Sequence, residues 1–245
     1  MRRLRGSERR CDRKDGSGNA GPARRLMPSF RHFSQSLRRI FPPHHLMGCA
    51  MRSQRIALLV EIALCAALSA VLSMLAVRLP INIAGGSVSF AMVPIFALAL
   101  RRGLVPGVIA GALFGFTDLL IEPYFVAPIQ VALDYPIAYA ALGLAGLGAP
   151  LYRRARTKSA AAASATALAF MVLGGLGRFA AAWTSGVVFF GANAPAGQPV
   201  WLYSLGYNAT YIVPSMIICA AAAIVILPVL EHAVPSAPRS ERIAS

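Results

Sequence analysis

The sequence has few charged residues, no paired cysteines and almost no lysine. Charged side chains make up 13% of the 245 residues, whereas hydrophobic side chains make up 57%. This balance excludes an ordinary soluble domain and indicates a membrane protein. The four cysteines have no CxxC or other paired spacing, so they predict neither a disulfide framework nor a zinc site (Cys11, Cys49, Cys65 and Cys219).

Motifs for nucleotide hydrolysis and for common catalytic sites are also missing. Lys14 and Lys158 are the only lysines, and neither ends a glycine-rich GxxxxGK[ST] phosphate loop. No HExxH or GxSxG motif occurs, and the histidines lie outside the apolar stretches (His32, His44, His45 and His232). We therefore expect no metal, no cofactor and no catalysis. An intramembrane enzyme that uses Asp118 and Asp134 stays open as an alternative, because two carboxylates can share acid–base chemistry.

The basic residues are gathered near the beginning of the chain. Fourteen of the 24 Lys and Arg precede Ile56, although the net charge of the whole chain is +15. We expect residues 1–55 to be a disordered basic leader without an assigned function, with Met47 and Met51 as alternative starts. Topology and anionic lipid explain such an asymmetric charge, so no nucleic acid partner is expected.

Six apolar stretches follow the leader, at residues 56–79, 88–100, 104–121, 128–151, 160–190 and 200–230. The second is short for a membrane span, and the fifth is long enough to be broken near Gly174, Gly175 and Gly177. A basic loop is expected at 153–158. Basic residues lie at alternate connections, which predicts that both termini are cytoplasmic. The sequence thus predicts an all-α protein of the bacterial plasma membrane, with a six-helix domain at 56–230 and a polar cytoplasmic tail at 231–245.

Small residues recur at four-residue spacing in two of the spans. Gly107, Gly111 and Gly115 form a GxxxGxxxG stripe, which predicts close packing between helices. In the first span Ala63 and Ala67 form one AxxxA pair, and a second pair is offset by three residues (Ala66 and Ala70). The spacing leaves open whether these faces pack internally or dock another membrane protein, and a pure scaffold remains a third possible function.

The fourth span is unusual because Asp134 lies about two turns past its start at Pro128. An ionisable side chain at that depth marks a functional site by default. Gln130 lies on the same helix face, and Pro136 is expected to loosen the backbone. The structural alternative is that Asp134 pairs with an arginine, such as Arg178, only to hold the helices together.

Aromatic residues accompany this carboxylate in the sequence. Tyr203, Tyr207 and Tyr211 recur at four-residue spacing in the sixth span, beside Asn208. Aromatic faces with one carboxylate and one amide suit a flat cationic heteroaromatic ligand. An aromatic belt at the membrane interface explains the tyrosines equally well.

Several longer segments resemble a known family. These are VEIALCAALSAVLS, SFAMVPIFALALRRGLVPGVIAGALFGFTDLL, PYFVAPIQVALDYPIAYAALGLAGL, GRFAAAWTSGVVFFGANAP and LYSLGYN. They resemble the thiamine-binding branch of the substrate-binding S components of energy-coupling factor transporters, over about residues 56–230. The resemblance implies a vitamin uptake subunit without catalysis of its own, which joins a transmembrane coupling protein and two cytosolic ATPase subunits.

The resemblance also implies roles for individual residues. It places Ala63 and Ala67 against the coupling protein. Carried over by motif, the ligand-binding positions are Tyr124, Asp134, Tyr135, Gly186, Phe190, Tyr203 and Asn208.

Three departures from the family pattern bear on the substrate. Ala182 stands where the family has a histidine, and family tryptophans fall near Gly86 and at Phe190. Thiamine is therefore the leading substrate, and a related flat vitamin or a pyrimidine precursor is the alternative.

Overall fold

The computed structural model describes residues 44–78 and 86–233, with side chains for 54–76 and 86–231. The chain divides into two units, 1–52 and 53–245. Residues 44–55 of the expected leader and 231–233 of the expected tail belong to helices, and the rest of both segments lies outside the described residues. Everything below concerns the second unit.

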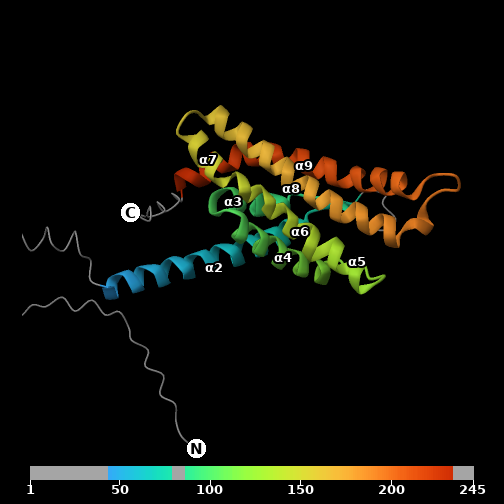
Figure 1. Cartoon of the computed structure of the whole chain (residues 1–245), viewed down its shortest axis with the longest axis horizontal. Helices are drawn as coiled ribbons and strands as arrows, with labels where there is room; N and C mark the ends of the chain where they lie inside the picture. Colours follow the sequence, from blue (N-terminus) through green and yellow to red (C-terminus); the bar gives the residue numbers. More distant parts are fainter. Residues whose placement is uncertain (1–43, 79–85, 234–245) are drawn as a thin grey trace, which may run out of the picture. The chain divides into compact units, whose positions relative to one another are not determined.

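The described chain is almost entirely helical (Figure 1). The only strands among the described residues, β1 (Val77–Arg78) and β2 (Ser87–Val88), form a short antiparallel pair. The helices, in chain order, are α2 (His44–Met74), α3 (Met92–Arg102), α4 (Leu104–Ile121), α5 (Pro128–Ala132), the π-helix η2 (Leu133–Ile137), α6 (Ala138–Ala141), the 3₁₀-helix η3 (Leu142–Gly148), α7 (Ala149–Arg156), α8 (Ala160–Phe189), the 3₁₀-helix η4 (Gly191–Asn193) and α9 (Val200–Ala233).

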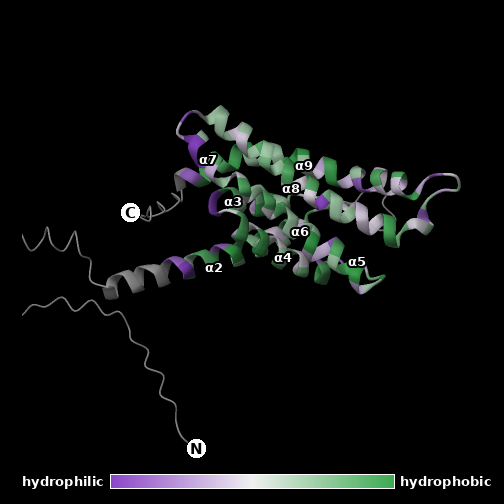
Figure 2. Cartoon of the chain, in the orientation of Figure 1, coloured by the Kyte–Doolittle hydropathy of each residue, from purple (hydrophilic) through white to green (hydrophobic). Residues whose placement is uncertain are grey.

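Five helical segments of the described chain are long and apolar enough to cross a membrane, namely Gln54–Met74, Leu104–Ile121, Pro128–Arg156, Ala160–Phe189 and Val200–Glu231. Figure 2 shows hydrophobic residues along these helices. Their outer faces carry exposed aliphatic side chains; Leu120, for example, is 82% exposed. Surfaces of this kind are stable in hydrocarbon and not in water, so the prediction of a helical membrane protein is confirmed.

The second apolar stretch forms a helix that is too short to cross a bilayer by itself. α3 has 11 residues, and every residue from Met92 to Leu100 is buried. At about 1.5 Å per residue the helix reaches only about half of a hydrocarbon core. The residues before it do not extend the helix, because β2 and the following turn hold them in other conformations.

Three other boundaries differ from the sequence prediction. The first span ends as a helix at Met74 rather than at residue 79, because Val77 and Arg78 pair with β2. The fifth span is one continuous helix, so its length does not reflect a break at the glycines. The basic segment at 153–158 is largely helical, because α7 continues to Arg156.

The glycines of α4 pack directly against the backbone of the fourth span. A Cβ atom on Gly111 would lie 2.2 Å from the carbonyl oxygen of Tyr139, and one on Gly115 would lie 2.6 Å from that of Tyr135. No side chain fits at these distances. The close-packing role predicted for the GxxxGxxxG stripe is confirmed.

The two alanine pairs of α2 face different surroundings. Ala66 and Ala70 are buried, whereas Ala63 and Ala67 are exposed. Ala66 and Ala70 therefore contribute to internal packing, whereas Ala63 and Ala67 lie on the surface of the described chain. Glu61, also on α2, forms a bidentate ion pair with Arg102 of α3.

Candidate functional site

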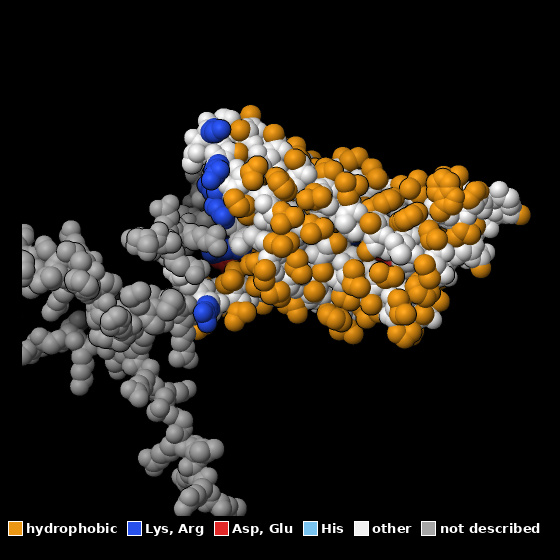
Figure 3. All heavy atoms as spheres, in the orientation of Figure 1, with side chains coloured by type: hydrophobic (Ala, Val, Ile, Leu, Met, Phe, Trp, Pro, Cys, Tyr) orange, Lys and Arg blue, Asp and Glu red, His pale blue; other side chains and the backbone are white. Residues whose placement is uncertain are grey.

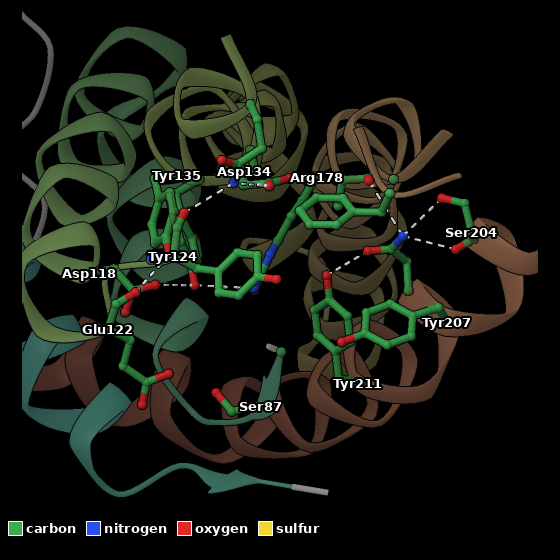
Figure 4. A pocket seen from close by; sticks show the side chains of 18 of the residues that line it. Ser87, Asp118, Glu122, Tyr124, Asp134, Tyr135, Arg178, Ser204, Tyr207 and Tyr211 are labelled. Atoms are coloured by element: carbon green, nitrogen blue, oxygen red, sulfur yellow. Dashed lines mark hydrogen bonds between the residues drawn. The ribbon is translucent and has the colours of Figure 1, made fainter. Parts of the chain in front are cut away.

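A cavity of about 430 Å³ lies between α4, the fourth span, α8 and α9 (Figure 4). This volume lies within the range of about 300–1,000 Å³ that is typical of small-molecule sites. Figure 4 shows side chains from these elements pointing into a common space. All seven residues predicted to bind ligand line this cavity: Tyr124, Asp134, Tyr135, Gly186, Phe190, Tyr203 and Asn208. The structure thus brings the predicted residues together, while their contact with a ligand stays a prediction.

Asp134 belongs to a π-helical turn of the fourth span. The turn, Leu133–Ile137, contains Pro136, which lacks the N–H needed for a regular helical hydrogen bond. Gln130 Nε2 donates to Asp134 Oδ2 at 2.7 Å. Among the described residues no Lys or Arg forms an ion pair with Asp134. The alternative pairing of Asp134 with Arg178 is therefore wrong.

The loop before α5 is held by two side chains of the fourth span. The Tyr135 hydroxyl donates to the carbonyl oxygen of Glu122 at 2.6 Å and accepts from the N–H of Tyr124 at 3.0 Å. Gln130 accepts from the N–H of Val126 at 3.0 Å. These bonds fix the backbone of Tyr124, whose ring lies 5.8 Å from that of Phe190 at the end of α8. Tyr135 thus positions the loop with its hydroxyl and offers its ring to the cavity.

The start of α9 supplies a polar and aromatic wall. Tyr203, Tyr207 and Tyr211 all line the cavity, as the pocket interpretation of this stripe requires, and their contact with a ligand stays a prediction. Asn208 accepts from the Tyr211 hydroxyl at 2.6 Å and donates to the Ser204 carbonyl at 2.9 Å. Its amide is therefore held in one orientation, with lone-pair capacity left on Oδ1.

The opposite wall holds a cluster of three residues, Asp118, Tyr139 and Arg178, that the sequence analysis did not assign to the ligand site. Tyr139 donates to Asp118 Oδ2 at 2.8 Å and accepts from Arg178 Nη2 at 3.2 Å. The Arg178 guanidinium also lies 4.3 Å from the centre of the Tyr139 ring. Arg178 is only 8% exposed. An arginine inside an apolar span is itself a signal of function, and it could have identified this group.

Four ionisable side chains with formal charge at neutral pH line the cavity: Asp118, Glu122, Asp134 and Arg178. Three carboxylates against one guanidinium give a formal charge of −2. Arg178 interacts with Tyr139 on the Asp118 side of the cavity, whereas no ion pair of Asp134 occurs among the described residues. The cavity therefore favours a cation with an apolar, flat body.

The three departures from the family pattern all border this space. Ala182, Gly86 and Phe190 line the cavity. Gly86 has φ +94°, and a Cβ atom there would lie 2.7 Å from the Tyr211 ring. Trp183 does not line the cavity; its indole N–H donates to the Trp201 carbonyl at 3.0 Å. The tryptophan that follows Ala182 therefore does not replace the family histidine.

No cluster of three or more metal-ligating side chains occurs in the part of the chain that the structure describes. Carboxylates and one arginine, without histidine or cysteine, are also a poor donor set for a transition metal. The described cavity is suited to an organic cation.

Comparisons with known proteins agree in pointing to one family. The model of the family "Thiamine transporter protein" (Thia_YuaJ) matches residues 59–235. The thiamine transporter ThiT of Bacillus subtilis is 42% identical over 173 residues, covering 69% of this chain and 89% of the relative. ThiT of Lacticaseibacillus paracasei is 38% identical over 125 residues, covering 49% and 62% of the two chains. A solved structure of ThiT from Listeria monocytogenes superposes with a TM-score of 0.66 at 26% identity, covering 72% of this chain and 96% of that one.

Proposed function

Because this chain belongs to the thiamine transporter family, we propose that it is the thiamine-binding S component of an energy-coupling factor importer. Its relatives are transporters, so the chain is a transport protein of the bacterial cell membrane rather than an enzyme that uses Asp118 and Asp134. The observation that carries the ligand proposal is Asp134, a carboxylate that lines the cavity with a neutral amide as its hydrogen-bond partner.

Thiamine matches this cavity in charge and shape. Both of its rings are aromatic and therefore flat. The thiazolium ring is cationic and attracts a carboxylate, and the pyrimidine ring carries an amino group. In the proposed complex Asp134 meets the charged or amino end of the ligand. Tyr124, Tyr203 and Phe190 contact the rings, and the free lone pair of Asn208 accepts a hydrogen bond. Gly186 lets Ser204 of α9 approach α8 closely at this wall, since a Cβ atom there would lie 2.2 Å from Ser204 Oγ.

A thiamine titration of the detergent-purified protein tests this proposal. Trp183 and Trp201 are the only tryptophans. Neither lines the cavity, but the Trp183 carbonyl accepts from Ser204, which does, so their fluorescence should report binding. Asp134→Asn keeps the shape and removes the charge, and it should weaken binding roughly tenfold to a hundredfold. Asp118→Asn is the matched comparison: it removes one carboxylate charge from the same cavity, but at a carboxylate that already accepts from the Tyr139 hydroxyl, so it should weaken binding less. Equal affinity of wild type and Asp134→Asn would refute the assigned role of Asp134.

The same assay separates thiamine from the alternative substrates. A pyrimidine precursor or another flat vitamin that displaces thiamine at lower concentration would be the better ligand. Ala182→His restores the family side chain, and we expect it to favour thiamine over such competitors. A wild-type protein that folds but binds none of them would support the scaffold alternative instead.

We further propose that the chain crosses the membrane six times, with both termini in the cytoplasm. Residues 86–89 lead into α3 in non-helical conformation, and at about 3.3 Å per residue they would add about 13 Å to that helix. Non-helical backbone is tolerated at membrane depth where protein satisfies it. Here Ser215 Oγ accepts from the N–H of Ser89 at 3.3 Å. Cysteine labelling at Gly197 and at Thr157 should then report opposite sides of the membrane.

The coupling partners follow from the same proposal. Because this chain has no phosphate loop, energy must come from ATPase subunits joined through a transmembrane coupling protein. The exposed pair Ala63 and Ala67 is the proposed contact, since small residues let helices approach closely. Ala67→Trp should leave thiamine binding intact and abolish copurification with the coupling protein. Leu68→Trp is the control, because Leu68 is also exposed and lies about 100° around the same helix from Ala67. Copurification that survives Ala67→Trp would place the contact elsewhere.

A further inference from the structure

A second cavity, of about 290 Å³, lies between α7, the first half of α8 and the last part of α9. It shares no lining residue with the first cavity. Its floor is built from small or apolar buried side chains, including Ala163, Ala167 and Leu227. Ile224 lines it and is nevertheless 44% exposed, so the recess opens onto the apolar outer surface of α9.

One end of this cavity is polar and carries an excess of positive charge. Glu231, only 6% exposed, accepts an ion pair from Arg156 at 2.6 Å and another from Arg101 at 3.3 Å. Two guanidinium groups thus share one carboxylate. Arg156 lines the cavity. Arg153 and Lys158, which are exposed, lie within three positions of Arg156 in the sequence. Figure 3 shows Lys and Arg side chains gathered at this end of the unit, beside a broad hydrophobic surface.

We propose that the second cavity binds one anionic phospholipid. The cavity lies where the membrane-length helices α8 and α9 meet the basic residues, which is the level of the lipid headgroups. Basic pockets between spanning helices suit anionic headgroups. The phosphate contacts Arg156 and the neighbouring basic side chains, and one acyl chain occupies the alanine-lined recess. The excess positive charge selects an anionic lipid over a zwitterionic one, because only the former supplies net negative charge.

Native mass spectrometry of the detergent-purified full chain tests this site, with phosphatidylglycerol and phosphatidylcholine of identical acyl chains as probes. We expect phosphatidylglycerol to bind about tenfold more tightly, the size of one charge-assisted contact. Arg156→Gln should remove this preference, while Arg101 still pairs with Glu231. Arg154→Gln is the matched control: it removes the same charge from α7, and Arg154 does not line the cavity. Ser164→Phe fills the recess from a half-buried position and should weaken both lipids.

Circular dichroism and monodisperse elution establish that each variant is folded, independently of thiamine binding. If Arg156→Gln does not fold, Arg156→Lys and Ser164→Phe still test the headgroup and the recess, with the lysine variant retaining the preference. Equal binding of the two lipids would overturn the proposal. An equal loss of the phosphatidylglycerol preference in Arg154→Gln would also overturn it, because the preference would then come from diffuse surface charge. Unchanged lipid binding in Ser164→Phe would overturn it as well, and would leave the recess to another occupant such as a partner helix.

Discussion

The side-chain amide of Gln130 lies 2.7 Å from the carboxylate of Asp134, one helical turn further along the fourth span. Gln130 is 1% exposed, and its amide also donates to the Tyr124 carbonyl at 3.3 Å. One buried amide therefore orients the proposed charge partner of the ligand and holds the loop that carries Tyr124. This contact joins two parts of the site that the sequence analysis treated separately.

Replacing this amide should impair binding without removing any proposed ligand contact. Gln130→Leu deletes the hydrogen bonds to Asp134, to the Tyr124 carbonyl and to the Val126 N–H, so the loop and the carboxylate lose their fixed geometry. We expect the Kd for thiamine to rise about tenfold. Fluorescence titration measures it, and Gln198→Leu, at an exposed position outside the cavity, is the control. Unchanged affinity in Gln130→Leu would show that the loop is held by other contacts.

The chain of contacts from Asp118 through Tyr139 to Arg178 should act as one unit in stability. Arg178→Leu removes a buried charged hydrogen bond, and we expect it to lower the free energy of unfolding by about 2–3 kcal/mol. Combined with Asp118→Asn, the loss should be smaller than the sum of the two single losses, because the two groups are coupled. Denaturation in mixed micelles measures the cycle. Strictly additive losses would mean that the two groups act independently.

The glycine stripe of α4 offers a second stability prediction. Gly111→Ala places a methyl group 2.2 Å from a backbone carbonyl oxygen, so α4 must move away from the fourth span. Overpacking of this kind costs about 1–3 kcal/mol. Gly206→Ala is the matched control, since nothing lies within 4 Å of its added Cβ atom and alanine favours the helix by about 0.5–1 kcal/mol. Thermal unfolding should therefore shift in opposite directions for the two variants.

Gly86 and Gly197 separate backbone strain from steric contact at the cavity. Both have positive φ, +94° and +84°, but only Gly86 faces a ring, that of Tyr211. Gly86→Ala should lower stability and also weaken thiamine binding, because Tyr211 must shift and it orients Asn208. Gly197→Ala should lower stability alone. Titration and thermal unfolding of both variants test this, and a binding defect of equal size in Gly197→Ala would contradict it.

Sequence reasoning succeeded where one residue type has one physical consequence. A carboxylate within an apolar span predicted a site, and Asp134 lines a cavity; the glycine stripe predicted close packing, which the structure confirms. It failed where distant contacts decide. The end of the first span depends on how β1 and β2 pair, and the expected break in α8 is absent because Gly174 and Gly175 are used for close contacts with Leu142 and Met216 rather than for a bend.

By itself the sequence determined that the chain resides in a membrane, where its helices lie and which polar residues need a reason to be there. These properties follow from the free-energy cost of placing charged side chains and unpaired backbone groups in hydrocarbon. This cost applies to each segment independently of the others. Only the tertiary structure decided which residues contact one another. It turned Arg178 away from Asp134 towards Tyr139, placed Ala66 inside and Ala67 outside, and joined Arg101 and Arg156 at Glu231. Such choices depend on packing between residues far apart in the chain, which local patterns do not record.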